Sequence, residues 1–344
     1  MSIPVFSSYI RRKDMDSVLS CLMTDSIGPG VYHERFLKSA KEYFGFEFCV
    51  LTRSPIDALG IALAAHDLKT GDAVAVSALA PRWLGFALRN RGIDIGWADV
   101  SLETGNPSPA DFATGMESVG QHAKALILAG GGGLPPVEGA YGELGLPIIE
   151  DLTRNLCASQ EGPMTLLSGT IGLLSLEQGS PLTSGGGAMV FATGKREATV
   201  LKNLAEDLLP EYRMTDFNAS LGLGQLRDLD KGLIKRKELR SLFLQAIAGK
   251  KHKTFMQGGD TEPGCWSFPV VLESSIKDAI AYARKKDVET EFAFADSCVA
   301  SGFVPEGRCP NARSLAMRTL LFPLHQRIGN AGAQKISRVL ASLP

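Results

Sequence analysis

The stretch SLEQGSPLTSGGGAMVF, from Ser175 to Phe191, places a loop rich in glycine and serine between two short apolar runs. The run GTIGLLSL begins at Gly169 and the run AMVFAT at Ala188, and both have the length and hydrophobicity of buried β-strands. No lysine occurs over residues 157–194, and Lys195 begins what we predict to be a surface helix. The stretch therefore predicts two strands joined by a long loop that carries no amine side chain.

Strand-like runs and helical stretches alternate through the first two thirds of the chain. Further candidate strands are AVAVSAL, IDIGWA, AKALILA and PIIED, and the candidate helices between them include PIDALGIALAAH and PRWLGFALRNRG. This alternation is typical of an α/β fold built on a mostly parallel sheet. After about residue 230 the pattern changes to long charged helices with a strand pair that includes CWSFPVVLE. We therefore expect a large α/β domain over residues 1–230 and a small C-terminal α+β domain over residues 231–344.

Four further segments form a recognisable series when they are read in order along the chain. They are SIGPGVYHERFLKSAKEYFGFEFCVLTRSPIDAL, PIIED, EYRMTDFNASLGLGQLRDLDKGLIKRKELR and ARSLAMRTLLFPLH. Together with the Ser175–Phe191 stretch they resemble the sugar aminotransferase family, the DegT and StrS group of fold-type I pyridoxal phosphate enzymes. The resemblance implies an aspartate aminotransferase-like fold and a homodimer with active sites between its subunits. It also suggests a role in polysaccharide or amino-sugar biosynthesis, by association only.

The resemblance also shows what this chain lacks at the cofactor anchor. The family pattern places a lysine after Ser-Phe and three variable residues, and this lysine holds the aldehyde of the cofactor as an imine. Counted along that pattern, Ser175 takes the place of the serine and Ser180 the place of the lysine. A serine hydroxyl cannot form an imine, so we expect neither covalent capture of the cofactor nor transamination.

The phosphate-binding turn of the family also differs here. A Ser-Gly-Thr at a helix N-terminus wraps the cofactor phosphate in the family, whereas this chain reads Ser54-Pro-Ile-Asp57. Proline has no N–H to donate, and a carboxylate in the first turn disfavours a phosphate there. The same residues make a good helix start, with Ser54 as N-cap and proline at the first helical position. Here we favour the structural interpretation.

Three other family contacts are altered and one is kept. Ala80-Pro81 stands where the family carries a stacking aromatic residue, and we predict Trp83 to lie on another helical face. Asp151 keeps the position of the aspartate that pairs with the pyridine nitrogen, although a salt-bridged strand-end aspartate is an equally good interpretation. Arg154 replaces the usual glutamine, and Glu211 replaces an asparagine that reaches the phosphate in the other subunit.

These changes leave three hypotheses for the vacated pocket. In the first, Arg154 and Glu211 form a charge network with Arg53 and Arg82 in a cofactor-free homodimer that has a structural or regulatory role. In the second, the arginines bind an anionic ligand such as a nucleotide sugar. In the third, a pyridoxal or pyridoxamine phosphate-dependent aminotransferase or dehydratase acting on a nucleotide-linked keto sugar persists. We expect no cofactor under the first two hypotheses.

Catalysis without a lysine at position 180 could persist in two other ways, and the sequence supports neither. Some relatives replace the lysine by histidine and run sugar dehydration, but all five histidines of this chain lie far from position 180. A lysine-bearing paralogue could supply the chemistry in a mixed dimer. In such a dimer, however, Glu211 of this chain would lie beside the cofactor phosphate of the paralogue, and a carboxylate repels a phosphate.

Composition excludes several other classes of function. The net charge of -1 gives no electrostatic reason to expect nucleic acid or an anionic membrane as a partner. The six cysteines show no spacing typical of a metal site, so we expect reduced thiols, no bound metal and a cytoplasmic protein. No segment has the length and hydrophobicity of a signal peptide or of a membrane-spanning helix.

Overall fold

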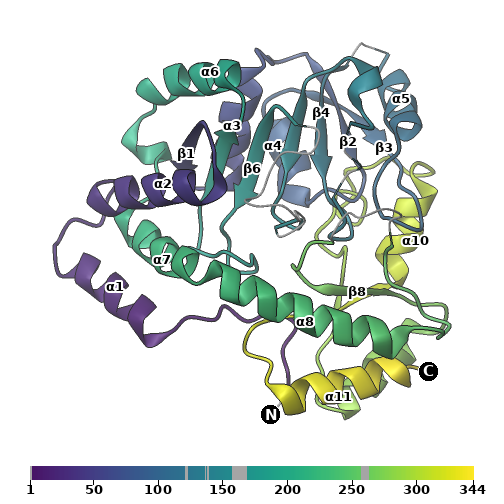
Figure 1. The fold of residues 1–344 in the computed structure, drawn as a ribbon. Helices are drawn as coiled ribbons and strands as arrows, with labels where there is room; N and C mark the ends of the chain where they lie inside the picture. Colours follow the sequence, from purple (N-terminus) through teal and green to yellow (C-terminus); the bar gives the residue numbers. More distant parts are fainter. Residues whose placement is uncertain (1, 121–122, 136, 138, 157–168, 257–262) are drawn as a thin grey trace.

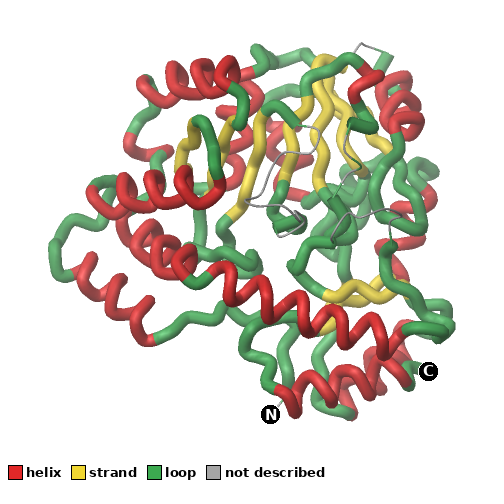
Figure 2. Tube along the Cα trace, viewed as in Figure 1, coloured by secondary structure: helices red, strands yellow, loops and turns green. Residues whose placement is uncertain are grey.

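The computed structural model describes residues 2–120, 123–135, 137, 139–156, 169–256 and 263–344. Helices cover both faces of a large central sheet, and a smaller sheet with its own helices lies beside it (Figure 1; Figure 2). The central sheet is mostly parallel, as the sequence predicts.

The large sheet has seven strands in the order β1-β7-β6-β5-β4-β2-β3. β7 runs antiparallel to β1 and to β6, whereas the pairs β6–β5, β5–β4, β4–β2 and β2–β3 are parallel. The strands are β1 Phe48–Thr52, β2 Ala73–Ser77, β3 Asp94–Ala98, β4 Ala123–Ala129, β5 Ile148–Asp151, β6 Ile171–Ser175 and β7 Ala188–Ala192. The strands predicted from the apolar runs are thereby confirmed, because runs buried on both faces carry few polar residues.

Helices enclose the sheet in two layers. Apolar residues of α3, α4 and α6 form one core with one face of the sheet, while α2 and α7 cover the β1–β7 end of the opposite face and α5 covers the β2–β3 end. The helices of this part are α1 Arg12–Leu22, α2 Val31–Phe44, α3 Pro55–Ala65, α4 Arg82–Asn90, α5 Pro109–Glu117, α6 Lys195–Glu206 and α7 Asp216–Arg227, with short 3-10 turns at Gly142–Leu144 and Pro210–Tyr212. The predicted surface helix after AMVFAT is α6.

The second sheet lies entirely beyond residue 230. It has the order β8-β10-β9, and all its pairs are antiparallel. α8 begins beside the predicted boundary, runs just above α11 in the lower part of Figure 1 and shares a core with α9 and α11. The elements are α8 Leu229–Ile247, β8 Phe268–Val271, α9 Ile276–Lys285, β9 Glu291–Phe292, α10 Pro310–Arg318, β10 Thr319–Phe322 and α11 Asn330–Ala341.

Two further observations concern the ends and the surface. The N-terminal segment reaches the second sheet region, where Ile3 forms a parallel bridge with Val288, so the predicted domain division at residue 230 stays a prediction. Among the described helices, none combines the length and hydrophobicity that crossing a bilayer requires.

Candidate functional site

The sheet topology gathers the predicted site residues at one edge. β1, β2, β4, β5 and β6 run in the same direction, so the segments that follow them lie at the same side of the sheet. These segments carry Ser54 after β1, Ala80-Pro81 after β2, the Gly130–Gly133 run after β4, and Asp151 and Ser175 at the ends of β5 and β6. Ligands of open α/β folds bind at this edge, which makes it the candidate site.

Asp151 and Ser175 are joined through Thr153. The Thr153 hydroxyl and its backbone N–H both donate to the Asp151 carboxylate, the latter at 3.0 Å. The same hydroxyl oxygen accepts the backbone N–H of Ser175 at 2.9 Å. Burial raises the pKa of Asp151, while these hydrogen bonds and the nearby Arg154 oppose that shift. Asp151 is therefore a buried carboxylate with bonded neighbours, and Thr153 is a site residue that the sequence reasoning missed.

The loop between β6 and β7 holds Ser180 in a closed arrangement. Leu176 N–H donates to Gly187 at the base of the loop, and the Leu176 carbonyl accepts the N–H of Ser184. Ser180 is buried, with 8% of its surface exposed, and its backbone N–H donates to Glu177. Gly187 has φ +97°, and a Cβ there would come within 2.8 Å of the Thr52 carbonyl oxygen. The glycines of this loop therefore allow a close approach to β1.

Arg154 packs on an aromatic residue of the C-terminal part of the chain. Its guanidinium carbon lies 4.4 Å from the ring centroid of Trp266, and its Nη1 donates to the Gly131 carbonyl at 3.4 Å. Burial lowers the pKa of Arg154, while Asp151 and Asp296 raise it. The cation is thus held by a ring face and a backbone carbonyl, and the charges of two carboxylates favour it.

Arg82 shares one of those carboxylates. Its Nε lies 2.6 Å from Asp296 Oδ1, and its backbone N–H donates to the Asp296 carbonyl at 2.8 Å. Both side chains of this ion pair are exposed. Asp296 therefore forms an ion pair with Arg82 and also raises the pKa of Arg154 through its charge.

Segment 296–299 also pairs with the backbone that follows β2. The Ala80 carbonyl accepts the N–H of Cys298 at 2.8 Å, and Pro81 forms an antiparallel bridge with Ser297. Trp83 is partly buried and packs against the hydrophobic core. The backbone of residues 80 and 81 is therefore taken up by packing against the segment that carries Asp296.

Ser54 caps α3, as predicted. Its hydroxyl oxygen accepts the N–H of Asp57 at 3.2 Å and its hydroxyl donates to the Asp57 carboxylate at 2.7 Å. The sequence Ser108-Pro-Ala-Asp111 begins α5 with the same arrangement, at 3.2 Å and 2.6 Å. Because the same motif starts a second helix, the structural interpretation of Ser54 is sufficient to explain its side chain.

Arg53 and Glu211 lie on adjoining segments. The backbone N–H of Arg53 donates to the Tyr212 carbonyl at 2.9 Å, and its Nε donates to the Arg213 carbonyl at 3.2 Å. Glu211 is exposed in the 3-10 turn Pro210–Tyr212. Within the described part of one protomer, no ion pair joins Glu211 to Arg154. A network between them would therefore have to form across a dimer interface, and it stays a prediction.

Within the described ranges, the cysteines and candidate metal ligands form no second site. The five cysteines in the described ranges are buried and form no disulfide with one another, while Cys157 lies outside those ranges, as does His122. No cluster of three histidine, cysteine or carboxylate side chains is placed to hold a metal ion within the described residues.

Comparisons with known proteins agree on a family and on a fold. Residues 8–341 match the model of the DegT/DnrJ/EryC1/StrS aminotransferase family. The chain is 23% identical to dTDP-4-dehydro-2,3,6-trideoxy-D-glucose 4-aminotransferase from Saccharopolyspora spinosa, over 94% of this chain and 92% of the relative. Among solved structures, it is similar to the aminotransferase TlmJ from Streptoalloteichus hindustanus, with a TM-score of 0.85, 22% identity and coverage of 99% and 98% of the two chains. It is also similar to GDP-4-keto-6-deoxy-D-mannose-3-dehydratase from Escherichia coli with bound hydrated PLP, with a TM-score of 0.84, 17% identity and coverage of 99% and 100%.

Proposed function

The chain belongs to the DegT/DnrJ/EryC1/StrS aminotransferase family, and we propose that it is a member that has given up transamination and binds an anionic ligand instead. The ligand class that we propose is a nucleotide-linked sugar, because the names of relatives refer to dTDP- and GDP-linked sugars. The observation that carries the proposal is Ser180, which takes the family's lysine position in a loop without lysine. Without an amine, this loop has no group that could hold an aldehyde as an imine.

The α3 N-terminus supports the same proposal. A helix N-terminus binds a phosphate through free N–H groups and the positive end of the helix dipole. Here Pro55 has no N–H, and the N–H of Asp57 is already bonded to Ser54. The Asp57 carboxylate also places a negative charge in the first turn. These residues do not fit a pyridoxal phosphate held at this helix, so we derive no step that passes through that cofactor.

Arg53, Arg82 and Arg154 are the residues that we propose for the anionic ligand. Arg53 and Arg82 are exposed, and all three side chains follow strands or begin helices at the same edge of the sheet. An arginine guanidinium has donors arranged to bind two phosphate oxygens at once, which suits a diphosphate group. Glu211, on the segment that adjoins Arg53, would then disfavour ligands that carry further negative charge in the part bound near Arg53.

One observation favours a cofactor-dependent enzyme as the second candidate function. Asp151 is kept, is buried, and is linked through Thr153 to Ser175, so the carboxylate that pairs with the pyridine nitrogen in the family has a defined position. An aminotransferase or dehydratase of this kind would use pyridoxal or pyridoxamine phosphate as a bound cosubstrate, without an imine to the protein.

A homodimer is part of the proposal, and an apolar stripe on α1 supports it. Met15, Leu19 and Leu22 lie on one face of the helix and are 50%, 56% and 42% exposed. Exposed apolar stripes of this kind are typical of interfaces between subunits. The molar mass in solution, measured by light scattering after gel filtration, should be twice that of the 36.8 kDa chain.

Thermal unfolding with a panel of ligands tests the proposed binding function. A ligand that binds only the folded state raises its stability in proportion to the logarithm of its concentration. We expect at least one dTDP-, GDP- or UDP-linked sugar, at about 100 times its Kd, to raise the melting temperature by about 3–5 °C. Pyridoxal phosphate should give no such rise. Stabilisation by pyridoxal phosphate alone would favour the second candidate and contradict the first.

A further inference from the structure

A second cavity lies away from the candidate site, where the end of α8 meets the second sheet. Its volume is about 790 Å³, within the range typical of small-molecule sites. The walls come from the loop after β3, the end of α8, residues 248–256 and the neighbouring parts of β8 and α10. The cavity includes none of the residues proposed for the nucleotide-linked sugar, so the two sites are separate.

Backbone pairing builds one side of this cavity. Val271 at the end of β8 exchanges backbone hydrogen bonds with Lys253 at 3.1 and 2.7 Å, and it pairs with Thr319 of β10 on its other side. Leu272 N–H donates to the Arg318 carbonyl at 2.9 Å. The segments that carry Lys253, Val271 and Arg318 therefore lie side by side in a rigid arrangement.

Apolar side chains line much of the remaining wall. Leu244, Ile247 and Val271 are buried or partly buried, whereas Leu102 and Met256 are 41% and 71% exposed. An apolar molecule in the cavity would cover Leu102 and Met256 and remove their surface from water.

The charged lining has one more cation than carboxylates. Lys250, Lys253 and Arg318 line the cavity together with two carboxylates, Glu103 and Glu273. Glu273 is already engaged, because its Oε1 accepts from Arg318 Nη1 at 2.9 Å. The side chains thus offer more positive than negative charge to a ligand.

Two buried donors in this wall have no hydrogen-bond partner among the residues that the structure describes. They are the Thr254 hydroxyl and the Arg318 Nε. Thr254 is buried, with 8% of its surface exposed. Unpaired buried donors destabilise a fold unless a partner reaches them. A rotation about χ1 of Thr254 would redirect its hydroxyl, and an anion in the cavity would provide the acceptor that this hydroxyl lacks among the described residues.

His252 also lines the cavity, but its ring nitrogens bond backbone groups and not a ligand. The backbone N–H of Glu273 donates to His252 Nδ1 at 3.1 Å, so the ring proton lies on Nε2, which donates to the Pro344 backbone oxygen at 2.9 Å. Both ring nitrogens are therefore occupied by backbone groups.

We propose that this cavity binds a small amphiphilic anion, with an aliphatic or aromatic body against the apolar wall and one carboxylate or phosphate group near Arg318, Lys253 and Thr254. The inference is independent of the proposed nucleotide-sugar site. It rests on the apolar wall, the excess of cations and the unpaired donors in one cavity.

Calorimetric titration of the full chain with octanoate tests the site, with octan-1-ol as an uncharged ligand of the same chain length. We expect octanoate to bind with a Kd of about 1 mM or tighter, and octan-1-ol to bind at least about tenfold more weakly. The same titration with octyl phosphate distinguishes a carboxylate site from a phosphate site. The head group of the ligand with the lower Kd is the one that the site prefers.

Two variants locate the binding within the molecule. Ala248→Trp adds bulk at an exposed lining position and should abolish binding of both ligands, whereas Ala341→Trp, exposed on α11, should leave both unchanged.

Arg318→Gln should weaken octanoate binding about tenfold or more and leave octan-1-ol binding unaffected. Lys253→Gln, at an exposed side chain, replaces Arg318→Gln if that variant does not fold. No octanoate binding up to about 10 mM, or binding that survives Ala248→Trp, would overturn the proposal.

Discussion

The Ser54 hydroxyl donates to the Asp57 carboxylate at 2.7 Å and accepts the Asp57 backbone N–H at 3.2 Å. This reciprocal contact closes the first turn of α3, where other family members are expected to hold a phosphate. Its side chains are satisfied within the chain, so the helix start is a structural feature.

Substitutions at the two equivalent caps test this interpretation. Ser54→Ala should destabilise the protein by about 0.5–2 kcal/mol, because the N–H of Asp57 loses its acceptor. Ser108→Ala at the matching cap of α5 should have an effect of the same size. Urea unfolding measures both. If Ser54→Ala left stability unchanged but abolished ligand binding, Ser54 would be a ligand contact and the structural interpretation would be wrong.

Arg154 and Arg82 offer a comparison of a partly buried cation with an exposed one. Arg154→Met should destabilise the fold by about 1–3 kcal/mol, because it removes the cation from the Trp266 ring and from the buried Asp151. Arg82→Met should change stability by about 0–1 kcal/mol, since its ion pair with Asp296 is exposed. Equal effects in chemical unfolding would show that the Trp266 contact contributes nothing to stability.

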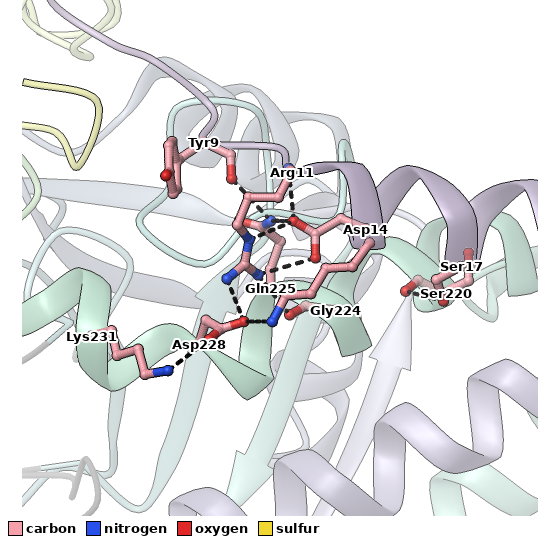
Figure 3. A network of polar contacts seen from close by, with 10 residues as sticks. Tyr9, Arg11, Asp14, Ser17, Ser220, Gly224, Gln225, Asp228 and Lys231 are labelled. Carbon is pink, nitrogen blue, oxygen red and sulfur yellow. Dashed lines mark hydrogen bonds and ion pairs between the residues drawn. The ribbon is translucent and has the colours of Figure 1, made fainter.

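The contacts between α1 and α7 predict a dependence of stability on pH. Figure 3 shows Arg11, Asp14, Gln225 and Asp228 in one polar network, in which Lys13 and Arg11 pair with Asp228. The hydrogen bond from Lys13, followed by that from Arg11, lowers the pKa of Asp228 to about 2 from its usual 3.8, against the opposing effect of burial.

A carboxyl whose pKa falls on folding stabilises the native state above its unfolded pKa and loses that effect as pH falls through its folded pKa. Wild type should therefore be more stable than Asp228→Asn at pH 6, and the difference should shrink between about pH 4 and pH 2. Asp67→Asn, at an exposed ion pair with Lys69, should have little effect. A difference between wild type and Asp228→Asn that stays constant over this range would contradict the account.

The Gly130–Gly133 run predicts a packing effect of a different kind. A Cβ at Gly131 would lie 2.3 Å from the Gly105 carbonyl oxygen, so backbone would have to move. Gly131→Ala should destabilise the protein by about 1–3 kcal/mol or more. Gly142→Ala, with no atom within 4 Å of the added Cβ, should be within about 1 kcal/mol of wild type. Thermal unfolding of the two variants measures the difference in stability. If Gly131→Ala left the stability unchanged, the backbone of this loop would be able to move away from the added Cβ at little cost.

The sequence predicts the large sheet well and the site only in part. The apolar runs identify β2 to β7 because helices cover both faces of this sheet, and Ser54-Pro55 identifies the start of α3 because capping is a local interaction. The position of Ser180 in the loop between β6 and β7 also follows from the local pattern.

The tertiary contacts of the charged residues could not be predicted in the same way. Arg154 meets Trp266 and the neighbourhood of Asp296, which lie more than a hundred residues further along the chain. The burial of the Gly130–Gly133 run could not be predicted either, because it depends on Phe255 and Asn155, which pack against it. Contacts of this kind depend on the assembled fold and leave no periodic signal in the sequence.

The central claim is that this chain no longer holds the family's cofactor through an imine. Its most direct test is the intact mass of the purified protein after incubation with pyridoxal phosphate and reduction with borohydride, followed by peptide mapping of any adduct. We predict no visible absorbance from an imine and no stoichiometric adduct at one lysine. A single adduct of one cofactor per chain, mapped to one lysine at the sheet edge near Asp151, would contradict the account.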